Sequence, residues 1–487
     1  MSKIKSYSTY SDFDQKWLGE IPSHWKIMKT KFLFNLVTDP APIGNSEKLL
    51  SVYTALGVKP RKELEARGNK ASSTDNYWRV EKGDIIINKL LAWMGAVGIS
   101  ECSGVTSPAY DILRAQENVN PYFFNYLFRN PIASREFKRH SRGIMDMRLR
   151  LYFTRFGDIK IPLPPLKEQN KIVDYLQFKL KKIDHFIHKK KQLIKLLNEQ
   201  KAGIINDAVT KGLNPNVKTK PSGIEWLGDI PEHWEVRKLK YVADCFPSNI
   251  DKHTRDDEKQ VRLCNYTDVY KNDFITNDMS LMFATATNEQ IEKFSLKIGD
   301  VIITKDSETA NDIAVPAVVK EELENVVCGY HLSVLRPYSK LVGEYLFRVL
   351  QCKPINIQFE LCSNGVTRVG LGVYDMKKAQ VPIPSLHEQK LIVSHIEAET
   401  AIINQAIATI EKEIALVLEY RTALIAEAVT GKIDVREYQI NEELKMENEE
   451  LEEDLDEELT EELEAELEGE LEDEGEIDYQ QQEIENE

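Results

Sequence analysis

The sequence has few cysteines, and none of them stands in a metal-binding or redox motif. The six cysteines are scattered, without a C-x-x-C pair and without histidines at zinc-ligand spacing. This absence excludes the common structural zinc sites and predicts reduced thiols inside a core.

Long apolar runs are also missing. Residues 1–17 lack the apolar segment of a signal peptide, and no window approaches the ~20 apolar residues that a membrane helix needs. We therefore expect a soluble cytoplasmic protein without a membrane partner. At 487 residues the chain is too long for one ordinary core, so two or more domains are expected.

Motifs for catalysis are absent as well. No glycine-rich loop joins a strand to a helix in the way that binds S-adenosylmethionine, and no G-x-x-x-x-G-K-[ST] is present for ATP. Asn120-Pro121 resembles the adenine-binding loop of methyltransferases, but the second proline is missing. We interpret Asn120 as a helix N-cap with a proline in the first helical turn.

A nuclease-like metal site is not supported either. Asp84 and Asp300 each follow a glycine and come five residues before a lysine, but no second acidic residue is placed to complete such a site. A turn that starts a strand is the simpler interpretation. We therefore assign no catalytic, cofactor-binding or metal-binding residue.

The negative charge is concentrated at the end of the chain. The net charge is -16, but residues 441–487 hold 25 Asp or Glu and one Lys, a charge of -24, which leaves +8 on residues 1–440. Because cationic side chains that displace counterions supply much of the affinity for DNA, this basic body is compatible with DNA. Charge repulsion favours a disordered tail over the weakly amphipathic helix that its leucine spacing allows.

The body of the chain contains an internal repeat. Residues 17–33 and 226–242 share nine of 17 positions, including the pattern W-L-G-x-I-P-x-H-W. Three further landmarks recur in the same order: GDIIINKL at 83–90 and GDVIITKD at 299–306, IPLPPLKEQNKIV at 161–173 and VPIPSLHEQKLIV at 381–393, and A-V-T at 208–210 and 428–430. The halves diverge between these landmarks, which indicates one scaffold with two different variable modules. The histidine and tryptophan of I-P-x-H-W are interpreted as a packing anchor.

Each variable module combines strand and helix patterns. The apolar runs after Gly83 and Gly299 predict strands, and the proline-rich segments at 161–166 and 381–386 predict that a strand stops before a helix begins. The fold class is therefore α/β, in the α+β sense.

Each half ends in a long helix pattern. Apolar residues follow steps of four and three over about 167–210, and the same spacing recurs from Ile392 to Ala428. Gly212 and Gly431 follow, where a helix C-cap needs a positive φ. A one-sided apolar stripe needs a partner, and each helix offers a matching stripe to the other. We predict two antiparallel coiled-coil helices that relate the halves by a pseudo-twofold axis.

These features resemble the specificity subunits of type I restriction-modification systems. The resemblance covers residues 1–435 and rests on WLGEIPSHW, PLPPLKEQ and AVTKG, followed by their repetition. It implies that each variable module is a target-recognition domain for half of a bipartite double-stranded DNA site. It also implies that the helices set the spacing and bind two modification (methyltransferase) subunits, through which the restriction (translocase) subunits join. The acidic tail is not expected from this family.

The resemblance implies a non-catalytic chain, with S-adenosylmethionine, ATP and Mg²⁺ bound by partner subunits only. It implies that residues 1–165 and 213–385 are the two target-recognition domains and that residues 166–212 and 386–435 are the two spacer helices. Residues 436–487 would form the acidic tail.

The best candidate for DNA contact is a basic stretch in the first half. From Arg135 to Arg155 seven Arg or Lys stand against two acidic residues, with aromatic residues between them. Arginine suits both phosphate and guanine contacts, whereas the alternative is a solvated basic face. The counterpart in the second half is the segment 363–378. The predicted DNA-binding residues are Lys89, Arg139, Arg142, Arg148 and Arg150 in the first half, and Lys305, Asn364 and Arg368 in the second.

Two other classes of function stay open. A self-contained DNA methyltransferase or nuclease with its own recognition modules would need the cofactor or metal motifs that are missing. A coiled-coil scaffold that never touches bases would show no sequence preference in a selection on random DNA. The bases that are read cannot be predicted, because base contacts depend on loop geometry.

Overall fold

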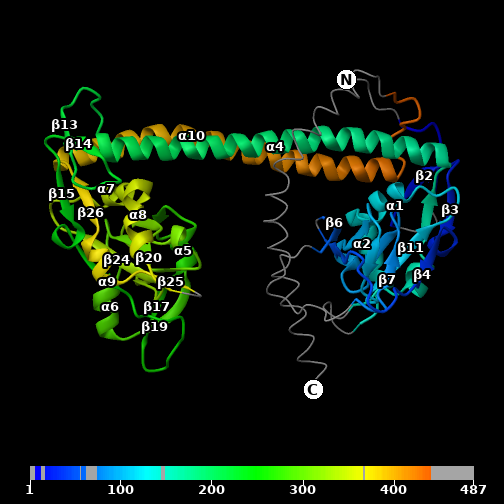
Figure 1. The fold of residues 1–487 in the computed structure, drawn as a ribbon, viewed down its shortest axis with the longest axis horizontal. Helices are drawn as coiled ribbons and strands as arrows, with labels where there is room; N and C mark the ends of the chain where they lie inside the picture. The colour runs from blue at the N-terminus through cyan, green and yellow to red at the C-terminus, as the bar shows by residue number, and fades with distance from the viewer. Residues whose placement is uncertain are drawn as a thin grey trace. The chain divides into compact units, whose positions relative to one another are not determined.

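The chain forms two compact units in the computed structural model (Figure 1). The structure describes residues 6–12, 17–54, 56–61, 74–143, 149–365 and 368–439. Unit 1 comprises Met1–Lys191 and Lys412–Glu487, and unit 2 comprises Gln192–Glu411. The predicted contact residue Arg148 and the acidic tail 441–487 lie outside the described residues.

Unit 1 contains an antiparallel four-stranded sheet in the order β4-β11-β8-β9, several two-stranded pairs and short helices. Its strands are β1 (Tyr10–Asp12), β2 (Glu20–Pro22), β3 (Lys26–Lys29), β4 (Phe34–Val37), β5 (Leu50–Tyr53), β6 (Gly57–Pro60), β7 (Trp78–Val80), β8 (Ile85–Asn88), β9 (Val97–Ile99), β10 (Gly104–Thr106), β11 (Tyr110–Ala115) and β12 (Lys160–Leu163). Its short helices are η1 (Thr30–Phe32), η2 (Ala92–Met94), α1 (Pro121–Phe128), α2 (Pro131–His140) and α3 (Phe153–Phe156).

Unit 2 contains a five-stranded sheet in the order β16-β24-β20-β22-β18 and a three-stranded sheet in the order β19-β17-β23. Its strands are β13 (Thr219–Pro221), β14 (Asp229–Pro231), β15 (Glu235–Lys238), β16 (Ala243–Pro247), β17 (Lys259–Cys264), β18 (Phe274–Ile275), β19 (Met282–Ala286), β20 (Val301–Thr304), β21 (Asp306–Ser307), β22 (Pro316–Val319), β23 (Val326–Cys328), β24 (Leu332–Pro337), β25 (Val369–Gly370) and β26 (Gln380–Ile383). Its short helices are η4 (Leu239–Tyr241), α5 (Tyr266–Tyr270), η5 (Ala310–Asp312), α6 (Asn288–Phe294), α7 (Gly343–Gln351), α8 (Lys353–Cys362) and α9 (Val373–Lys378).

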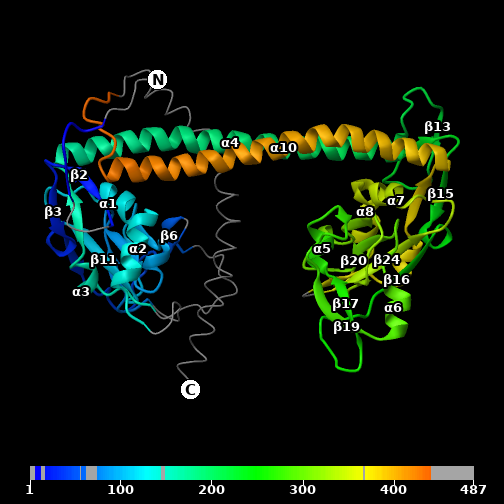
Figure 2. The same cartoon turned by 180° about the vertical axis from the view of Figure 1, so that it is seen from behind.

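The main sheets of the two units have the same arrangement of central strands. Strands β4-β11-β8 in unit 1 and β16-β24-β20 in unit 2 follow one another in the same order, and β8 and β20 are the two Gly-Asp landmarks of the repeat. Strands and short helices are mixed in both units, as the ribbon seen from behind shows (Figure 2). The predicted mixed α/β class is confirmed at this level.

The landmark strands begin with three consecutive apolar residues because both of their faces are covered. In β20, Val301 and Ile303 pack into one core cluster and Ile302 into another. In β8, Ile85 and Ile87 face one cluster and Ile86 the other. A strand that is buried on both sides reads as a continuous apolar run rather than as an alternating one. This burial explains why these segments stand out in the sequence.

In each proline-rich segment a strand ends and a long helix begins, as predicted. The first proline of each segment, Pro162 or Pro382, still lies inside the strand. Each of these strands belongs to a two-stranded sheet, with β3 and with β15. Every strand of such a pair is an edge strand, and there a missing N–H group costs no ladder hydrogen bond.

Two long helices follow the proline-rich segments. Helix α4 (Leu166–Lys211) begins in unit 1 and ends in unit 2, and α10 (Leu386–Val429) begins in unit 2 and ends in unit 1. Helix α4 ends one residue before, and α10 six residues before, the predicted end of its spacer segment, at 212 and 435. Gly212 and Gly431 adopt φ values of 73° and 75° at the helix ends, which confirms the predicted C-caps. A Cβ atom at Gly431 would come 2.3 Å from Pro22 Cδ, so this position also needs glycine for space.

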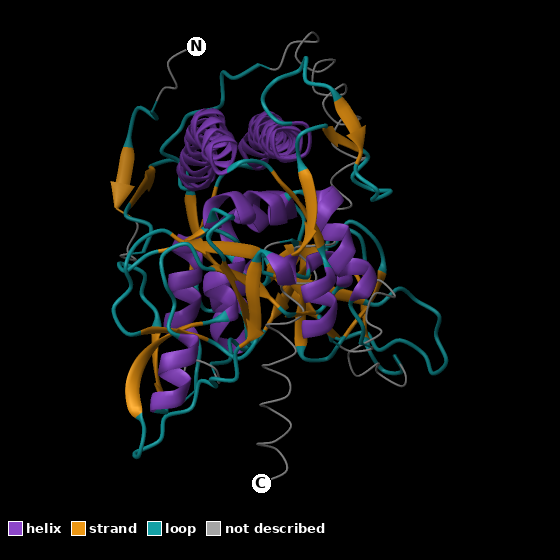
Figure 3. Cartoon of the chain, turned by 90° about the vertical axis from the view of Figure 1, so that its left-hand side faces the viewer, coloured by secondary structure: helices purple, strands orange, loops and turns teal. Residues whose placement is uncertain are grey.

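In each unit the start of one long helix packs into the same core as the end of the other. In unit 1, Ile172 and Leu176 of α4 share a core cluster with Leu424 and Ala428 of α10. In unit 2, Ala208 of α4 shares a cluster with Ile392 and Ile396 of α10. Ile205 of α4 is also buried in this cluster, whereas the adjacent Ile204 is only half-buried. Figure 3 looks along the two helices.

The repeated I-P-x-H-W motif is held by a glutamate in the first turn of a long helix. In unit 1, Glu168 Oε1 accepts a hydrogen bond from Trp25 Nε1 at 2.9 Å, and Glu168 Oε2 pairs with His24 Nε2 at 2.8 Å. In unit 2, Glu388 binds Trp234 Nε1 and His233 Nε2, both at 3.0 Å. The predicted packing role of this motif is confirmed, and its partner is the glutamate of the second repeated motif.

The neighbouring glutamine of that second motif holds a shorter helix. Gln169 Oε1 accepts the backbone N–H of Asn120, and Asn120 caps α1 through the backbone N–H of Tyr122 at 2.9 Å. In unit 2, Gln389 Oε1 accepts the backbone N–H of Val342, which precedes α7. The interpretation of Asn120 as a helix cap is confirmed. The adjacent Glu and Gln therefore join three separate segments in each half of the chain.

The aspartates of the Gly-Asp landmarks form turns, as predicted. Asp84 accepts the backbone N–H of Glu81 and binds Arg114 at 2.9 and 2.8 Å. Asp300 is buried and binds Arg336 in the same two-point geometry, at 2.8 and 2.6 Å. A buried carboxylate is stable only when it is paired. These arginines therefore hold in place the turns that precede β8 and β20.

Candidate nucleic-acid interface

The basic stretch of unit 1 forms the end of α2 and a hairpin that follows it. Arg142 and Arg150 face each other across this hairpin, with reciprocal backbone hydrogen bonds of 3.0 and 2.9 Å. Residues directly opposite each other in an antiparallel pair project to the same face, so two exposed guanidinium groups share one side. Two like charges on one face repel each other, and a phosphate bound between them would relieve this repulsion.

Arg139 is a weaker candidate than the sequence indicated. Its Nη1 donates to Glu136 Oε2 at 2.8 Å, and Glu136 is almost completely buried on α2. His140 Nδ1 also lies 3.4 Å from the same carboxylate. Glu136 therefore already balances part of the charge of Arg139, although two thirds of the Arg139 side chain are exposed.

Trp93, which lies outside the basic stretch in the sequence, adds an aromatic ring to this surface. Lys138 Nζ lies 4.6 Å from the centre of the Trp93 ring, which brings η2 next to α2. Tyr152, directly after the hairpin, is about half exposed. Aromatic rings beside arginines are common in nucleic-acid interfaces, but nothing in the sequence places Trp93 next to the basic stretch.

Lys89 is held inside unit 1. Its Nζ donates to the backbone oxygen of Pro108 at 2.9 Å and lies 3.3 Å from Asp111 Oδ1. Burial raises the pKa of Asp111 above its ordinary value, and Lys89 acts in the opposite direction. These contacts favour a structural role for Lys89 over the predicted DNA contact.

The predicted residues of unit 2 lie together. Asn364 forms a two-way backbone pair with Gly370, at 3.1 and 2.9 Å, in the same place after α8 that the Arg142–Arg150 pair occupies after α2. Strand β25 then pairs with β21, which begins directly after Lys305. The structure therefore brings Lys305, Asn364 and the exposed Arg368 to one surface. Asn364 holds the place in unit 2 that Arg142 holds in unit 1.

Several residues of this surface were not found from the sequence. Lys305 Nζ lies 4.3 Å from the centre of the Tyr330 ring. His331 Nδ1 is 2.9 Å from Asp306 Oδ2, and the rings of Tyr330 and His331 meet edge to face at 5.0 Å. These residues precede β24 and follow β20, and only the pairing of these two strands brings them together.

A second pair of aromatic rings lies on α5 of unit 2. Tyr266 and Tyr270 are stacked with their centres 5.5 Å apart. The carboxylate of Asp312 accepts a hydrogen bond from Tyr270 and raises the pKa of its hydroxyl group above the ordinary value. Arg368 and Asp312 both act electrostatically on Tyr266, so this pair lies near the hairpin that carries Arg368.

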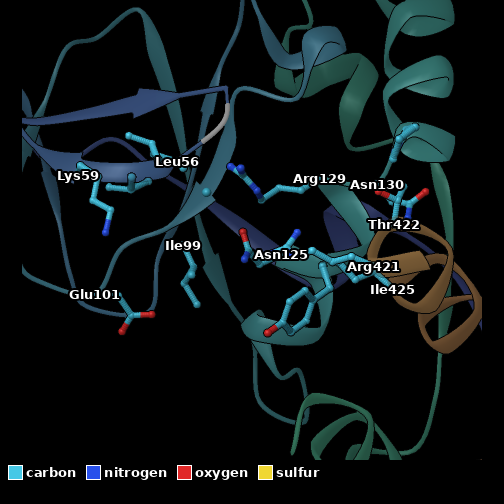
Figure 4. Close-up of a pocket in the computed structure, with 15 residues that line it drawn as sticks. Leu56, Lys59, Ile99, Glu101, Asn125, Arg129, Asn130, Arg421, Thr422 and Ile425 are labelled. Atoms are coloured by element: carbon cyan, nitrogen blue, oxygen red, sulfur yellow. The ribbon is translucent and has the colours of Figure 1, made fainter. Parts of the chain in front are cut away.

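Unit 1 also contains a polar cavity of about 490 Å³ between α1, the loop before β6 and the last turns of α10 (Figure 4). Arg129 donates to the backbone oxygens of Val97 and Thr54 along its wall. Asn125 Oδ1 is buried there and accepts no hydrogen bond from the described residues. Burial raises the pKa of Tyr126, also in the lining, to about 12.

Metal-binding clusters and membrane spans were sought in the part of the chain that the structure describes. No group of three or more His, Cys, Asp or Glu is placed to hold a metal ion there. No helix among these residues is both long enough and apolar enough to cross a membrane.

The cysteines differ partly from the prediction. Cys264 and Cys328 are buried, and burial raises the pKa of both thiols well above the ordinary value. Cys362, however, is exposed on α8, so the expectation of a core thiol is wrong at this position. All six cysteines are free thiols in the structure.

Comparisons with known proteins agree on one family. A family model described as "Type I restriction modification DNA specificity domain" matches residues 22–196 and again residues 231–415. The chain is 21% identical over 425 residues to the type I restriction enzyme MjaVIII specificity subunit of Methanocaldococcus jannaschii, which covers 85% of this chain and 94% of that protein. It is also 21% identical over 369 residues to the type I restriction enzyme EcoBI specificity subunit of Escherichia coli, with 74% and 75% covered.

One solved structure supports the same fold. It is described as the "Structural basis underlying complex assembly and conformational transition of the type I R-M system", and it matches with a TM-score of 0.62 at 14% identity. The match covers 85% of this chain and 99% of that chain. At this level of identity the likeness concerns the fold alone.

Proposed function

Because the chain belongs to the type I restriction-modification DNA specificity family, we propose that it recognises a bipartite double-stranded DNA site for a methylating and cleaving complex. One observation carries this proposal: the family model matches twice, and each match has its own set of strands and its own surface hairpin. Two recognition modules in one chain would read two half-sites.

Residues 1–165 and 213–385 would be the two target-recognition domains, and residues 166–212 and 386–435 the spacer helices. The helices would pair as an antiparallel coiled coil with a pseudo-twofold axis. Two ion pairs in unit 1 support this arrangement: Arg421 Nε lies 3.0 Å from Asp184 Oδ1, and Lys190 Nζ lies 2.7 Å from Glu413 Oε2. The residue numbers rise along α4 as they fall along α10, as antiparallel pairing requires.

The partners would be double-stranded DNA and two modification subunits, bound through the long helices. The repeat supports two copies, because each half offers the same junction between a helix start, a helix end and the I-P-x-H-W motif. The restriction and translocase subunits would join through the modification subunits. The chain would act without catalysis of its own, and S-adenosylmethionine, ATP and Mg²⁺ would be bound by these partners, since the sequence carries no motif for them.

Reconstitution with the modification subunits tests the proposed function. The full complex is expected to methylate DNA at one bipartite sequence, whereas the chain alone is expected to methylate nothing. The measurement is a map of methylated positions in DNA exposed to the complex or to the chain alone. Methylation by the chain alone would favour a self-contained methyltransferase, and binding of random DNA without preference would favour a scaffold.

The arginine pair of unit 1 is predicted to contact phosphates. Affinity for DNA falls as salt rises, and each neutralised phosphate adds about 0.9 to the steepness of log affinity against log salt. If Arg142 and Arg150 each neutralise one phosphate, replacing both by alanine makes this dependence shallower by about 2. The change is measured by binding titrations of the complex at several salt concentrations. Arg237→Ala, an exposed arginine paired with Glu235 on β15, is the control and is expected to leave the slope unchanged. A slope that stays the same in the double variant contradicts this contact.

A further inference from the structure

An exposed His–Asp–Tyr–Lys cluster lies at one end of the main sheet of unit 2. Tyr330 and His331 stand between β23 and β24, and Lys305 and Asp306 directly follow β20. About half of Tyr330 and about two fifths of the His331 side chain are exposed, so both rings can be reached from outside. No landmark of the repeat includes these two aromatic residues.

The cluster is held by both its backbone and its side chains. The backbone N–H of Lys305 donates to the oxygen of His331 at 3.0 Å, which extends the pairing of β20 with β24. An ionised carboxylate only accepts hydrogen bonds, so His331 Nδ1 donates to Asp306 Oδ2. This contact fixes the imidazole and leaves its Nε2 facing away from Asp306. Lys305 fixes the Tyr330 ring from one side at 4.3 Å.

The equivalent place in unit 1 has the same strand pairing but different side chains. Tyr110 pairs with Asn88 in unit 1, and Leu332 pairs with Thr304 in unit 2. Counting back one and two residues from these pairs places Ala109 where unit 2 has His331, and Pro108 where unit 2 has Tyr330.

The lysine of this framework is present in both units, but it meets different groups. Lys89 Nζ donates to the backbone oxygen of Pro108, whereas Lys305 Nζ lies over the ring of Tyr330. Leu90 stands where unit 2 has Asp306. The lysine is therefore common to the two units, while the exposed side chains around it differ. This is the pattern expected where two modules of one scaffold read different sequences.

A catalytic interpretation of the His331–Asp306 pair is less satisfactory. A His–Asp pair supports catalysis when the second ring nitrogen activates a nucleophile. Among the residues that the structure describes, no hydroxyl or thiol group is hydrogen-bonded to His331 Nε2. The free ring edge is suited instead to a partner from outside the protein.

We propose that Tyr330 and His331 read one base pair of double-stranded DNA for unit 2, with Lys305 and Asp306 as positioning residues. This inference rests on the proposed function and names the specificity element within it. His331 Nε2 hydrogen-bonds to a base edge in the major groove, where each base pair presents a distinct set of donors and acceptors. The ring of Tyr330 packs beside the same base pair.

The test uses the full chain in complex with its modification subunits. Wild type and the variants His331→Ala, Tyr330→Ala and Asp306→Asn are each selected on a DNA library that is randomised in both half-sites. His331→Ala is expected to lose about tenfold in discrimination at one base pair of one half-site, because a good base contact contributes about that much. Tyr330→Ala is expected to weaken the preference within the same half-site, and Asp306→Asn to have a smaller effect at the same base pair.

Tyr338→Ala is the matched control. Tyr338 is about as exposed as Tyr330 but follows the opposite end of β24, so its loss is expected to leave every preference unchanged. A melting temperature equal to that of wild type shows that a variant is folded. Unchanged discrimination in folded His331→Ala overturns the inference, and so does an equal loss in both half-sites. Failure of the wild-type complex to prefer any sequence overturns instead the proposed function on which the inference rests.

Discussion

Insertion of seven residues into each long helix is expected to move the two half-sites apart by about three base pairs, with neither half-site sequence changed. Seven helical residues add about 10 Å at 1.5 Å each, and base pairs are spaced by 3.4 Å. The insertions belong after Lys191 and after Glu411, where each helix passes from one compact unit to the other. A seven-residue insertion keeps the steps of four and three, so the apolar stripe stays continuous.

The measurement is a selection on DNA that carries both half-sites with spacers of every length. Three added base pairs also rotate the second half-site around the DNA axis, so one inserted heptad is expected to weaken binding as well. Three inserted heptads add about 31 Å, close to one turn of DNA, and should restore both the phase and much of the affinity. A seven-residue insertion into only one of the two helices is the control, because the inserted residues then have no facing residues on the other helix. A changed base preference at an unchanged spacer length would contradict the spacer role of the helices.

Replacement of Trp234 by alanine is expected to destabilise unit 2 by about 3–5 kcal/mol, which is the usual cost of deleting a buried large aromatic side chain. Trp234 is completely buried, and its Nε1 donates to Glu388 in the first turn of α10. The same ring packs against Gly212, just after the end of α4. Its loss therefore opens the place where unit 2 joins the end of one long helix to the start of the other.

Chemical denaturation of the full chain measures this effect. Trp234→Phe is the matched control, because it keeps an aromatic ring in the core and loses the hydrogen bond to Glu388 with the smaller ring of the indole. Its expected cost is smaller, about 1–2 kcal/mol. Trp25→Ala should destabilise unit 1 in the same way, since Trp25 binds Glu168 there. If Trp234→Ala unfolds at the same denaturant concentration as wild type, the assigned role of this motif is wrong.

The periodic features of the chain could be predicted well. The long helices, their terminal glycines, the landmark strands and the cap at Asn120 all agree with the structure. Each of these depends on short-range rules: apolar spacing along a helix, positive φ after a helix end, or a side chain that bonds two residues onward. Such rules need no knowledge of distant residues.

The details of the candidate interface could not be predicted in the same way. Lys89 was expected to contact DNA, yet Pro108 and Asp111 hold it, because β8 pairs with β11. Glu168 carries no sign in the sequence that it will bind Trp25, more than a hundred residues earlier. The hydrogen bond between His331 and Asp306 also spans two strands. Each of these contacts depends on strand register, which the sequence of a single strand does not specify.

By itself, the sequence determined that this protein is one scaffold used twice, with two long helices and a basic body, because repeats, periodicity and charge can be read residue by residue. Only the tertiary structure decided which basic residues are held inside a unit and which stay exposed. The physical reason is that a charge balanced by a neighbour, as in Lys89 with Asp111, offers less to a ligand than a charge that stays exposed, as in Arg368. Those neighbours are set by the pairing of distant segments.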